Sequence, residues 1–492
     1  MSEDHTTYRF GPLERRGLLG AVRVSQAVLV AGSLAASVVL TRSFGSSGAV
    51  ISVMVIAAAT SSATVRVHGQ TVEQWFPVLS AFMLRGLRGN TRFRSALPSL
   101  GTAHLQDGTE LLPALKLPAP LDGLQLGAVS SGRWQVGMFS ERRGRFLTGV
   151  IACRSLSFTL LDRDAQERRL AEWGQLLAAA AATPVRRLQW IERTAPAQGD
   201  ELARWLSSAR DPSLPAIGIP IVDSYLELIS RSTEVRHDHE ILLAVQIDTT
   251  RVREPRAKAG ASLVEALTQV AQSLEAAEIQ VLGMLTPGQL WQAVRTAFDP
   301  YAGAELAARR QLSATNRELP AAAMLPAAAD EAWSHYRCDA AFHATFWIAD
   351  WPRTEVSPMF MDSLLGTSAT VRTVAVTFEP VTPERSVREA EAAITQDRAD
   401  SELRRRFGQS ETARQRQAQE SAARREAELA AGHCEVRLAG FVTVSGRDEQ
   451  DLRRACAEIH LHAARGRLTL QRMYGQQAQA FGFTLPTARG LK

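Results

Sequence analysis

Two long uncharged stretches near the N-terminus restrict the fold more than any other feature. No residue from Val24 to Thr41 is charged, and none from Ser43 to Val65. Each stretch is close to the ~20 residues with which a helix crosses ~30 Å of hydrocarbon. Only Arg42 and a short polar run separate them, so residues 1–70 are predicted to form a transmembrane hairpin of two helices. Two buried helices of a soluble core, or a cleaved signal peptide, fit less well, because buried helices are shorter and no clear cleavage site is present.

Small residues recur every four positions in both stretches. Such spacing lets two helix backbones approach closely in lipid, where packing replaces the hydrophobic driving force. The residues predicted to pack the two helices together are Ala27, Ala31, Ala35, Ala57 and Ser61.

The distribution of arginine predicts the orientation in the membrane. Arginines flank both outer ends of the hairpin, whereas the connecting turn holds Arg42 alone. By the positive-inside rule, this predicts a multi-pass plasma-membrane protein with both termini in the cytoplasm. The four cysteines lie far apart in sequence, which suits a cytosolic location for most of the chain. The arginines predicted to set topology or contact lipid are Arg15, Arg16, Arg23, Arg85, Arg88, Arg92 and Arg94.

A juxtamembrane segment, residues 71–100, follows the hairpin. Its aromatic residues Trp75 and Phe76 stand beside the arginine cluster, which predicts a basic amphipathic helix lying at the membrane surface. An ordinary amphipathic helix packed on the soluble domain explains the same pattern equally well, so both readings stay open.

Most of the remaining chain alternates short strands with helices. Residues 101–302 are predicted to form a cytosolic α+β domain, and the alanine-rich residues 303–334 a linker. Within the first domain, Asp164 is expected to cap a helix that ends before Pro184. The strands expected there are 134–139, 146–152, 185–192 and 241–247, and the helices are 164–183, 221–229, 263–274 and 287–298.

The C-terminal domain, residues 335–492, has the clearest layout. It reads as two split βαβ units around a long charged helical insertion, residues 383–431. Such units form an antiparallel sheet with helices on one face, so we predict an α+β fold of the ferredoxin-like kind. The first domain could follow the same plan, although no repeat is measurable in the sequence. The expected strands are 342–349, 371–378, 434–444 and 468–473, and the shorter helices are 358–365 and 449–464.

No catalytic constellation stands out. The chain has only three lysines, and neither Lys116 nor Lys258 follows a glycine, which excludes a P-loop. There is no GxSxG, HExxH or strand-associated GxGxxG motif. His237 and His239 would share one face of a strand but lack a nearby third ligand. The sequence therefore predicts no enzyme activity, no cofactor and no metal site.

Four features together resemble a known family. They are Thr7–Gly17 (TYRFGPLERRG), the two-span hairpin, Trp347–Arg353 (WIADWPR) and Thr484–Leu491 (TLPTARGL). This combination resembles actinobacterial membrane proteins of conjugation or type IV secretion-like gene clusters. The hairpin is similar to the small inner-membrane subunit of those machines, and the cytosolic part to the non-catalytic N-terminal half of their ATPase.

The resemblance implies a non-enzymatic inner-membrane scaffold that docks a separate ATPase and other membrane subunits. A homo-oligomer is left open. A first alternative is a membrane component of a type VII secretion complex. A second is a nucleic-acid-binding membrane tether that uses Arg85–Arg94 and the arginine-rich helix, which ranks lower because that helix lacks the interleaved aromatic residues of single-strand platforms.

Overall fold

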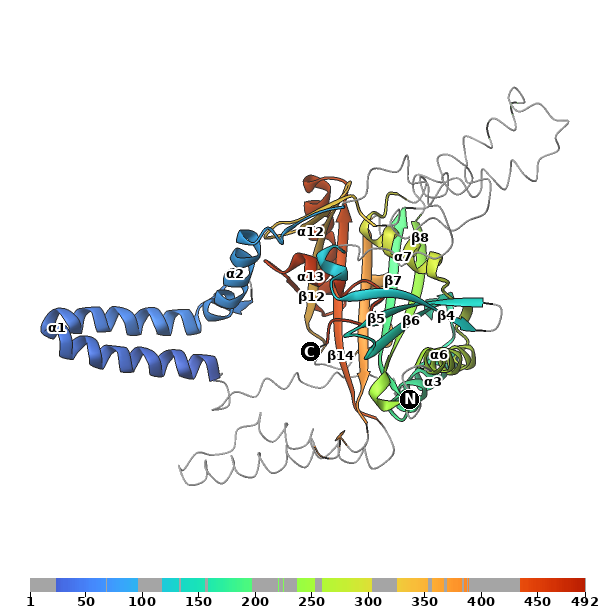
Figure 1. The fold of residues 1–492 in the computed structure, drawn as a ribbon, viewed down its shortest axis with the longest axis horizontal. Coiled ribbons are helices and arrows are strands. Elements are labelled where there is room, and N and C mark those ends of the chain that lie inside the picture. Colours follow the sequence, from blue (N-terminus) through green and yellow to red (C-terminus); the bar gives the residue numbers. More distant parts are fainter. Residues whose placement is uncertain are drawn as a thin grey trace, which may run out of the picture.

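The computed structural model describes residues 24–67, 69–95, 117–131, 134–154, 158–196, 220, 224, 237–252, 259–302, 325–352, 356–366, 370–382, 385, 386, 388 and 434–491. One long apolar helical element, α1 (Val24–Thr64), projects from a mixed body of helices and strands (Figure 1). A short strand pair, β1 (Arg66–Val67) and β2 (Gln70–Thr71), connects α1 to the helix α2 (Val72–Leu87). Strand β3 (Arg92–Arg94) then joins the edge of the body's sheet.

The body is built on a single antiparallel sheet of thirteen strands. Its path runs β3-β10-β11-β12-β14-β13-β7-β8-β6-β5-β4, with β15 paired to β12 and β9 paired to β6. Strands β7 and β13 pair in register from Leu188–Phe378 to Thr194–Arg372, so they join the two halves of the sheet. The two predicted cytosolic domains thus share one continuous sheet.

The first half of the sheet and its helices, here called the first unit, come from residues 124–298. The elements are β4 (Leu124–Ser131), β5 (Trp134–Glu141), β6 (Phe146–Arg154), α3 (Arg163–Ala181), β7 (Val185–Pro196), β8 (His237–Asp248), α6 (Ala259–Ala276), β9 (Gln280–Met284) and α7 (Pro287–Phe298). Short 3-10 turns lie at Ala119–Leu121, Phe158–Leu160 and Thr249–Arg251.

The second unit, from residues 328–482, repeats this order. The elements are β10 (Ala328–Glu331), β11 (Tyr336–Cys338), β12 (Ala341–Asp350), α9 (Asp362–Leu365), β13 (Val371–Pro380), β14 (Val436–Gly446), α12 (Glu449–Arg465), β15 (Thr469–Arg472) and α13 (Gln477–Gly482). The pairings in one unit have counterparts in the other. In the first unit β6 pairs with β8, β5 and β9, and in the second unit β12 pairs with β14, β11 and β15. Apart from the edge strand β3, the strand path is therefore symmetric about the β7–β13 seam.

Helices cover both faces of the sheet. On one face α3 and α6 pack on the first unit, and α9 and α12 on the second, over alternate strand residues such as Leu243 and Val442. On the other face α7 and α13 share a core with Val150, Leu242 and Ala375. The prediction of helices on one face alone is therefore wrong.

Several expected elements have different limits in the structure. The expected helix 358–365 is reduced to α9, four residues long. Residues 328–331 of the expected linker form strand β10, whose Ala329 and Glu331 are buried. The cap of α3 is Asp162 rather than Asp164, because the Asp162 carboxylate accepts the Ala165 N–H at 2.8 Å. The expected helix 221–229 and the charged insertion 383–431 lie outside the described residues, apart from Ser224, Arg385, Ser386 and Arg388.

Candidate membrane anchor and its junction with the sheet

The element α1 meets the length and composition requirement of a membrane span over Val28–Thr64. It turns back on itself at Gly45, whose φ of 56° and ψ of −128° are not helical. The two arms lie side by side in Figure 1, and the Gln26 side chain donates to the Ala63 carbonyl at 2.8 Å. Most of the apolar side chains along both arms are exposed, among them Val38, Val53 and Met54. A soluble protein rarely presents so large an apolar surface to water.

Serines, not the predicted alanines, line the contact between the arms. Ser33, Ser37 and Ser52 are buried, and the Ser52 hydroxyl donates to the Ser37 carbonyl at 3.0 Å. Hydroxyl hydrogen bonds of this kind hold helices together in lipid.

The predicted packing face is accordingly wrong. Ser33 and Ser37 lie two residues beyond Ala31 and Ala35, which is about 200° around a helix. The predicted packing residues Ala31, Ala35, Ala57 and Ser61 are exposed, and the side chain of Ala27 lies outside the described residues.

Helix α2 packs one of its faces on the second unit. The Trp75 ring lies 5.8 Å from that of Trp333 and 6.0 Å from that of Tyr474, centroid to centroid. The Phe82 ring meets Trp333 edge-on at 5.3 Å. Trp75, predicted to contact the membrane, therefore contacts the body, whereas Phe76 on the next position is 75% exposed. The reading as a helix packed on the soluble body therefore holds for the face that carries Trp75, while contact of the other face with a membrane stays a prediction.

An ion pair with a buried carboxylate fixes the same helix face. The Arg85 Nε lies 3.4 Å from Glu331 Oε2, and Arg85 also donates to the Gly475 carbonyl. The other Glu331 oxygen accepts the Ala478 N–H at 3.1 Å. Burial raises the pKa of Glu331, and Arg85 opposes that rise by favouring the charged carboxylate. Arg85, predicted to set topology or contact lipid, holds α2 to the end of β10 and to the turn before α13.

The remaining predicted arginines are at the rim of the junction. Arg88, Arg92 and Arg94 are exposed, and Arg92 lies 3.7 Å from Asp330 across the β3–β10 pair. Exposed pairs of this kind add little stability. Arg15, Arg16 and Arg23 lie outside the described residues.

Chemically suggestive side chains of the body have structural partners. His239 contacts Thr194 at 3.2 Å, and the ring of His460 packs on Phe346. Burial raises the pKa of Cys153 to about 12, which disfavours a reactive thiolate. Among the described residues, no three His, Cys, Asp or Glu side chains form a group that could hold a metal ion.

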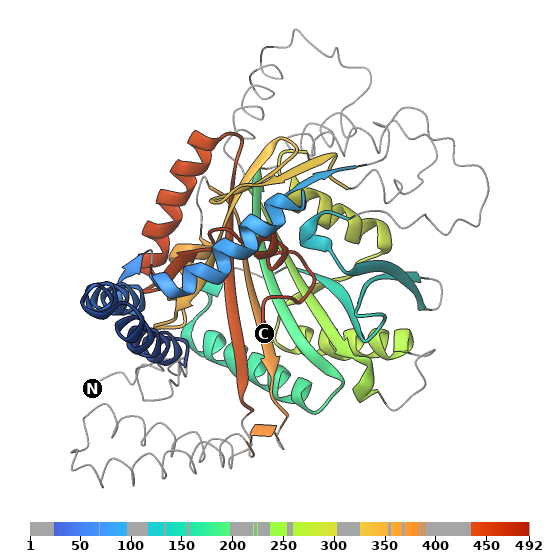
Figure 2. The ribbon, with the colours of Figure 1, turned by 60° about the vertical axis from the view of Figure 1, so that its left-hand side comes forward.

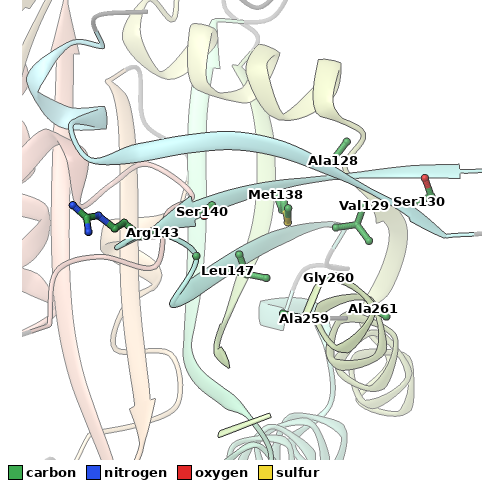
Figure 3. Close-up of a pocket in the computed structure, with 11 residues that line it drawn as sticks. Ala128, Val129, Ser130, Met138, Ser140, Arg143, Leu147, Ala259, Gly260 and Ala261 are labelled. Atoms are coloured by element: carbon green, nitrogen blue, oxygen red, sulfur yellow. The ribbon is translucent and has the colours of Figure 1, made fainter. Parts of the chain in front are cut away.

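An open pocket of about 680 Å³ lies between β4, β5 and the start of α6. Its lining is mainly apolar, with Val129, Met138 and Leu147 toward the helix, while the Arg143 side chain extends away from them (Figure 3). It brings together no acid, base and nucleophile of the kind that catalysis requires.

The C-terminal motif of the sequence crosses the β7–β13 seam. Gln189 of β7 donates to the Phe483 carbonyl at 2.7 Å and accepts the Ala488 N–H at 2.7 Å. Thr377 of β13 donates to the Arg489 carbonyl at 3.1 Å. The run Thr484–Leu491 thus ties the two units together.

Sequence reasoning found α2 but missed Trp333, Tyr474 and Glu331, on which it rests. Trp333 and Glu331 lie in the stretch expected to be a linker. The run Glu331-Ala332-Trp333 is the sequence feature that could have indicated their contact with α2. Comparison with known proteins adds no relative: no family model matches the chain, and no curated protein matches it.

Proposed function

We propose that this protein is a non-enzymatic, membrane-anchored scaffold of a conjugation or type IV secretion-like apparatus, whose body docks a separate ATPase. In this proposal the two arms of α1 cross the plasma membrane as a hairpin and both termini are cytoplasmic. The two units of the sheet are then ferredoxin-like domains that present docking surfaces to the other subunits. A type VII secretion component would have the same anchor and body, and the identity of the captured partners separates the two.

The observation that carries the proposal is the exposed apolar surface of α1 combined with its firm attachment to the sheet. Side chains such as Val38, Val53 and Met54 are exposed, as expected of a surface that lies in lipid. At the other end, α2 is joined to the second unit through Trp75 and the Arg85–Glu331 pair. The body is thereby held next to the anchor rather than tethered loosely.

The anchor is tested by placing a charge in the middle of the second arm. Val53→Arg should move the full-length protein from the membrane pellet to the supernatant or to inclusion bodies, since a central arginine costs about 3 kcal/mol of insertion free energy. Ser46→Arg, in the turn after Gly45, is the matched control and should stay in the pellet until detergent is added. Wild-type protein found in the supernatant after ultracentrifugation without detergent would contradict the proposal.

The docking role is tested on the wild-type protein in mild detergent. Affinity capture should recover a membrane-associated ATPase, and the purified protein alone should show no ATP turnover above background. Intrinsic turnover, or capture without any ATPase, would remove the docking part of the proposal and leave the anchor standing.

A further inference from the structure

The outward face of α2 is a continuous apolar stripe. Five residues spaced by four, three, four and four positions fall on one side of the helix, within about 80° of each other at 100° per residue. All five are exposed: Val72 (40%), Phe76 (75%), Leu79 (41%), Met83 (57%) and Leu87 (86%). Among the described residues, no ring contact joins Phe76 to the body.

This arrangement is the reverse of that expected for a helix on the surface of a soluble protein. Such a helix buries its apolar side and turns its charges outward. In α2 the charged residues are Glu73 and Arg85, and Arg85 is turned toward Glu331 in the body. The inner side is occupied by Trp75 and Phe82, so the outer apolar stripe needs a second cover.

The position of α2 indicates what that cover is. The Val72 N–H donates to the Val65 carbonyl at 3.3 Å, so the stripe begins where α1 ends. Figure 1 shows α2 running across the direction of the two α1 arms, between them and the body, and Figure 2 shows it laid along the body. A membrane crossed by α1 would therefore run alongside α2.

Charge agrees with that assignment. Arg88, Arg92 and Arg94 follow the stripe at its C-terminal end and are all exposed. A helix with one apolar side, flanked by arginines, binds anionic lipid through buried apolar area and attraction to headgroups. If the stripe instead bound a second copy of this chain, its apolar side chains would be covered, but the arginines of both copies would lie close together despite their like charge.

We propose that the outward stripe of α2 inserts into the boundary between headgroups and acyl chains of an anionic bilayer. Because the inner face of α2 is fixed to the second unit, the sheet would be held at one orientation over the membrane. This inference rests on the proposed anchoring by α1, and the test separates the two.

The test attaches an environment-sensitive fluorophore to single cysteines of the full-length protein in equimolar phosphatidylcholine–phosphatidylglycerol vesicles. The background carries Cys434→Ser, since Cys434 is the natural cysteine that is not buried. Phe76→Cys and Met83→Cys sample the stripe, Ala81→Cys samples the exposed position on the opposite side, and Val53→Cys reports on α1. Quenching by brominated acyl chains and by aqueous iodide is compared at each position.

The expected result is strong quenching by brominated lipid at positions 53, 76 and 83, with position 81 quenched several-fold more by iodide. Lipid quenching at 53 with iodide quenching at 76 and 83 overturns the inference and leaves the anchor intact. Iodide quenching at all four positions overturns both. If positions 76 and 83 are protected from both quenchers, and this protection disappears when the protein is diluted in lipid, the stripe binds a second copy of the chain. That result also overturns the inference.

Discussion

The two units of the sheet share their strand plan but differ in what covers them. In the first unit α3 is 19 residues long, and its Trp173 ring lies 5.7 Å from Trp190 of β7 and 5.7 Å from Phe378 of β13. One helix of the first unit thus covers both strands of the seam. The corresponding helix of the second unit, α9, has four residues.

The second unit instead carries the candidate membrane anchor. Trp333, Tyr474 and Glu331, which hold α2, all belong to it. The C-terminal run that bridges the seam also leaves from its last helix, α13. The comparison indicates a division of labour within a repeated plan, in which α3 of the first unit covers the seam and the second unit holds α2 and, through it, the candidate membrane span.

The largest expected effect comes from the contact between α7 of the first unit and α13 of the second. Phe298 is fully buried, and its ring lies 5.1 Å from that of Phe481. Phe298→Ala should lower the free energy of unfolding by about 4 kcal/mol, because a large cavity opens where the units meet. Urea unfolding of the full-length protein in detergent measures this. Leu461→Ala on the exposed side of α12 is the control, and an equal loss there would show that the contact between units is not special.

Buried polar pairs at matching places in the two units predict a difference in pH response. On β12 and β14, His343 Nδ1 meets the Ser445 hydroxyl at 2.8 Å, whereas β6 and β8 carry the uncharged pair Gln246 and Thr148 at 3.3 Å. The His343 Nε2 meets the Phe298 carbonyl at 2.9 Å, and the Phe481 ring lies beside it. Complete burial lowers the pKa of His343 to about 4.

The folded protein therefore holds His343 neutral, while the unfolded chain protonates it near its ordinary pKa of 6.5. The stability linked to this group is complete above pH 6.5 and falls as the pH drops toward 4, by about 3 kcal/mol. His343→Gln, which keeps an uncharged hydrogen-bonding side chain at this position, should remove that part of the pH dependence, whereas His239→Gln should not. Parallel pH profiles for wild type and His343→Gln would refute the assignment.

The seam itself is probed at Gln189, which makes two hydrogen bonds to the C-terminal run. Gln189→Ala leaves the Phe483 carbonyl and the Ala488 N–H buried without this partner and should cost about 2 kcal/mol. Gln135→Ala, at an exposed position near the start of β5, is the matched control, with a change within about 0.5 kcal/mol. Hydrogen exchange at Ala488 should accelerate in the first variant. An unchanged exchange rate would mean that the run does not depend on β7.

The sequence predicted the elements better than their partners. Short apolar runs marked β6, β8, β12, β13 and β14 within a few residues of their observed limits. The β7–β13 seam was not predicted, because an apolar run shows that a strand is buried but not which strand lies alongside it. The face of α2 that contacts the body was equally out of reach, since Trp333 and Tyr474 lie about 260 and 400 residues further along the chain. The contact between the arms of α1 does involve small residues four positions apart, Ser33 and Ser37. Alanines and serines recur with the same period, however, and the hydrogen bond from Ser52 to Ser37 lies on the serine face.

The smallest expected effect concerns the helix that distinguishes the units. Three acidic residues stand at the start of α3, and the carboxylate that caps it is Asp162, which accepts the Ala165 N–H. Asp162→Ala should therefore destabilise the protein by about 1 kcal/mol. Asp164→Ala, one residue inside the first turn, should cost only a few tenths, since it loses only the favourable interaction of a charge with the helix dipole. At the start of α9, Met361 provides no side-chain cap, so Met361→Asp tests whether adding a capping carboxylate stabilises the short helix. Equal losses at positions 162 and 164 would show that charge near the end of α3, rather than the cap itself, sustains the longer helix of the first unit.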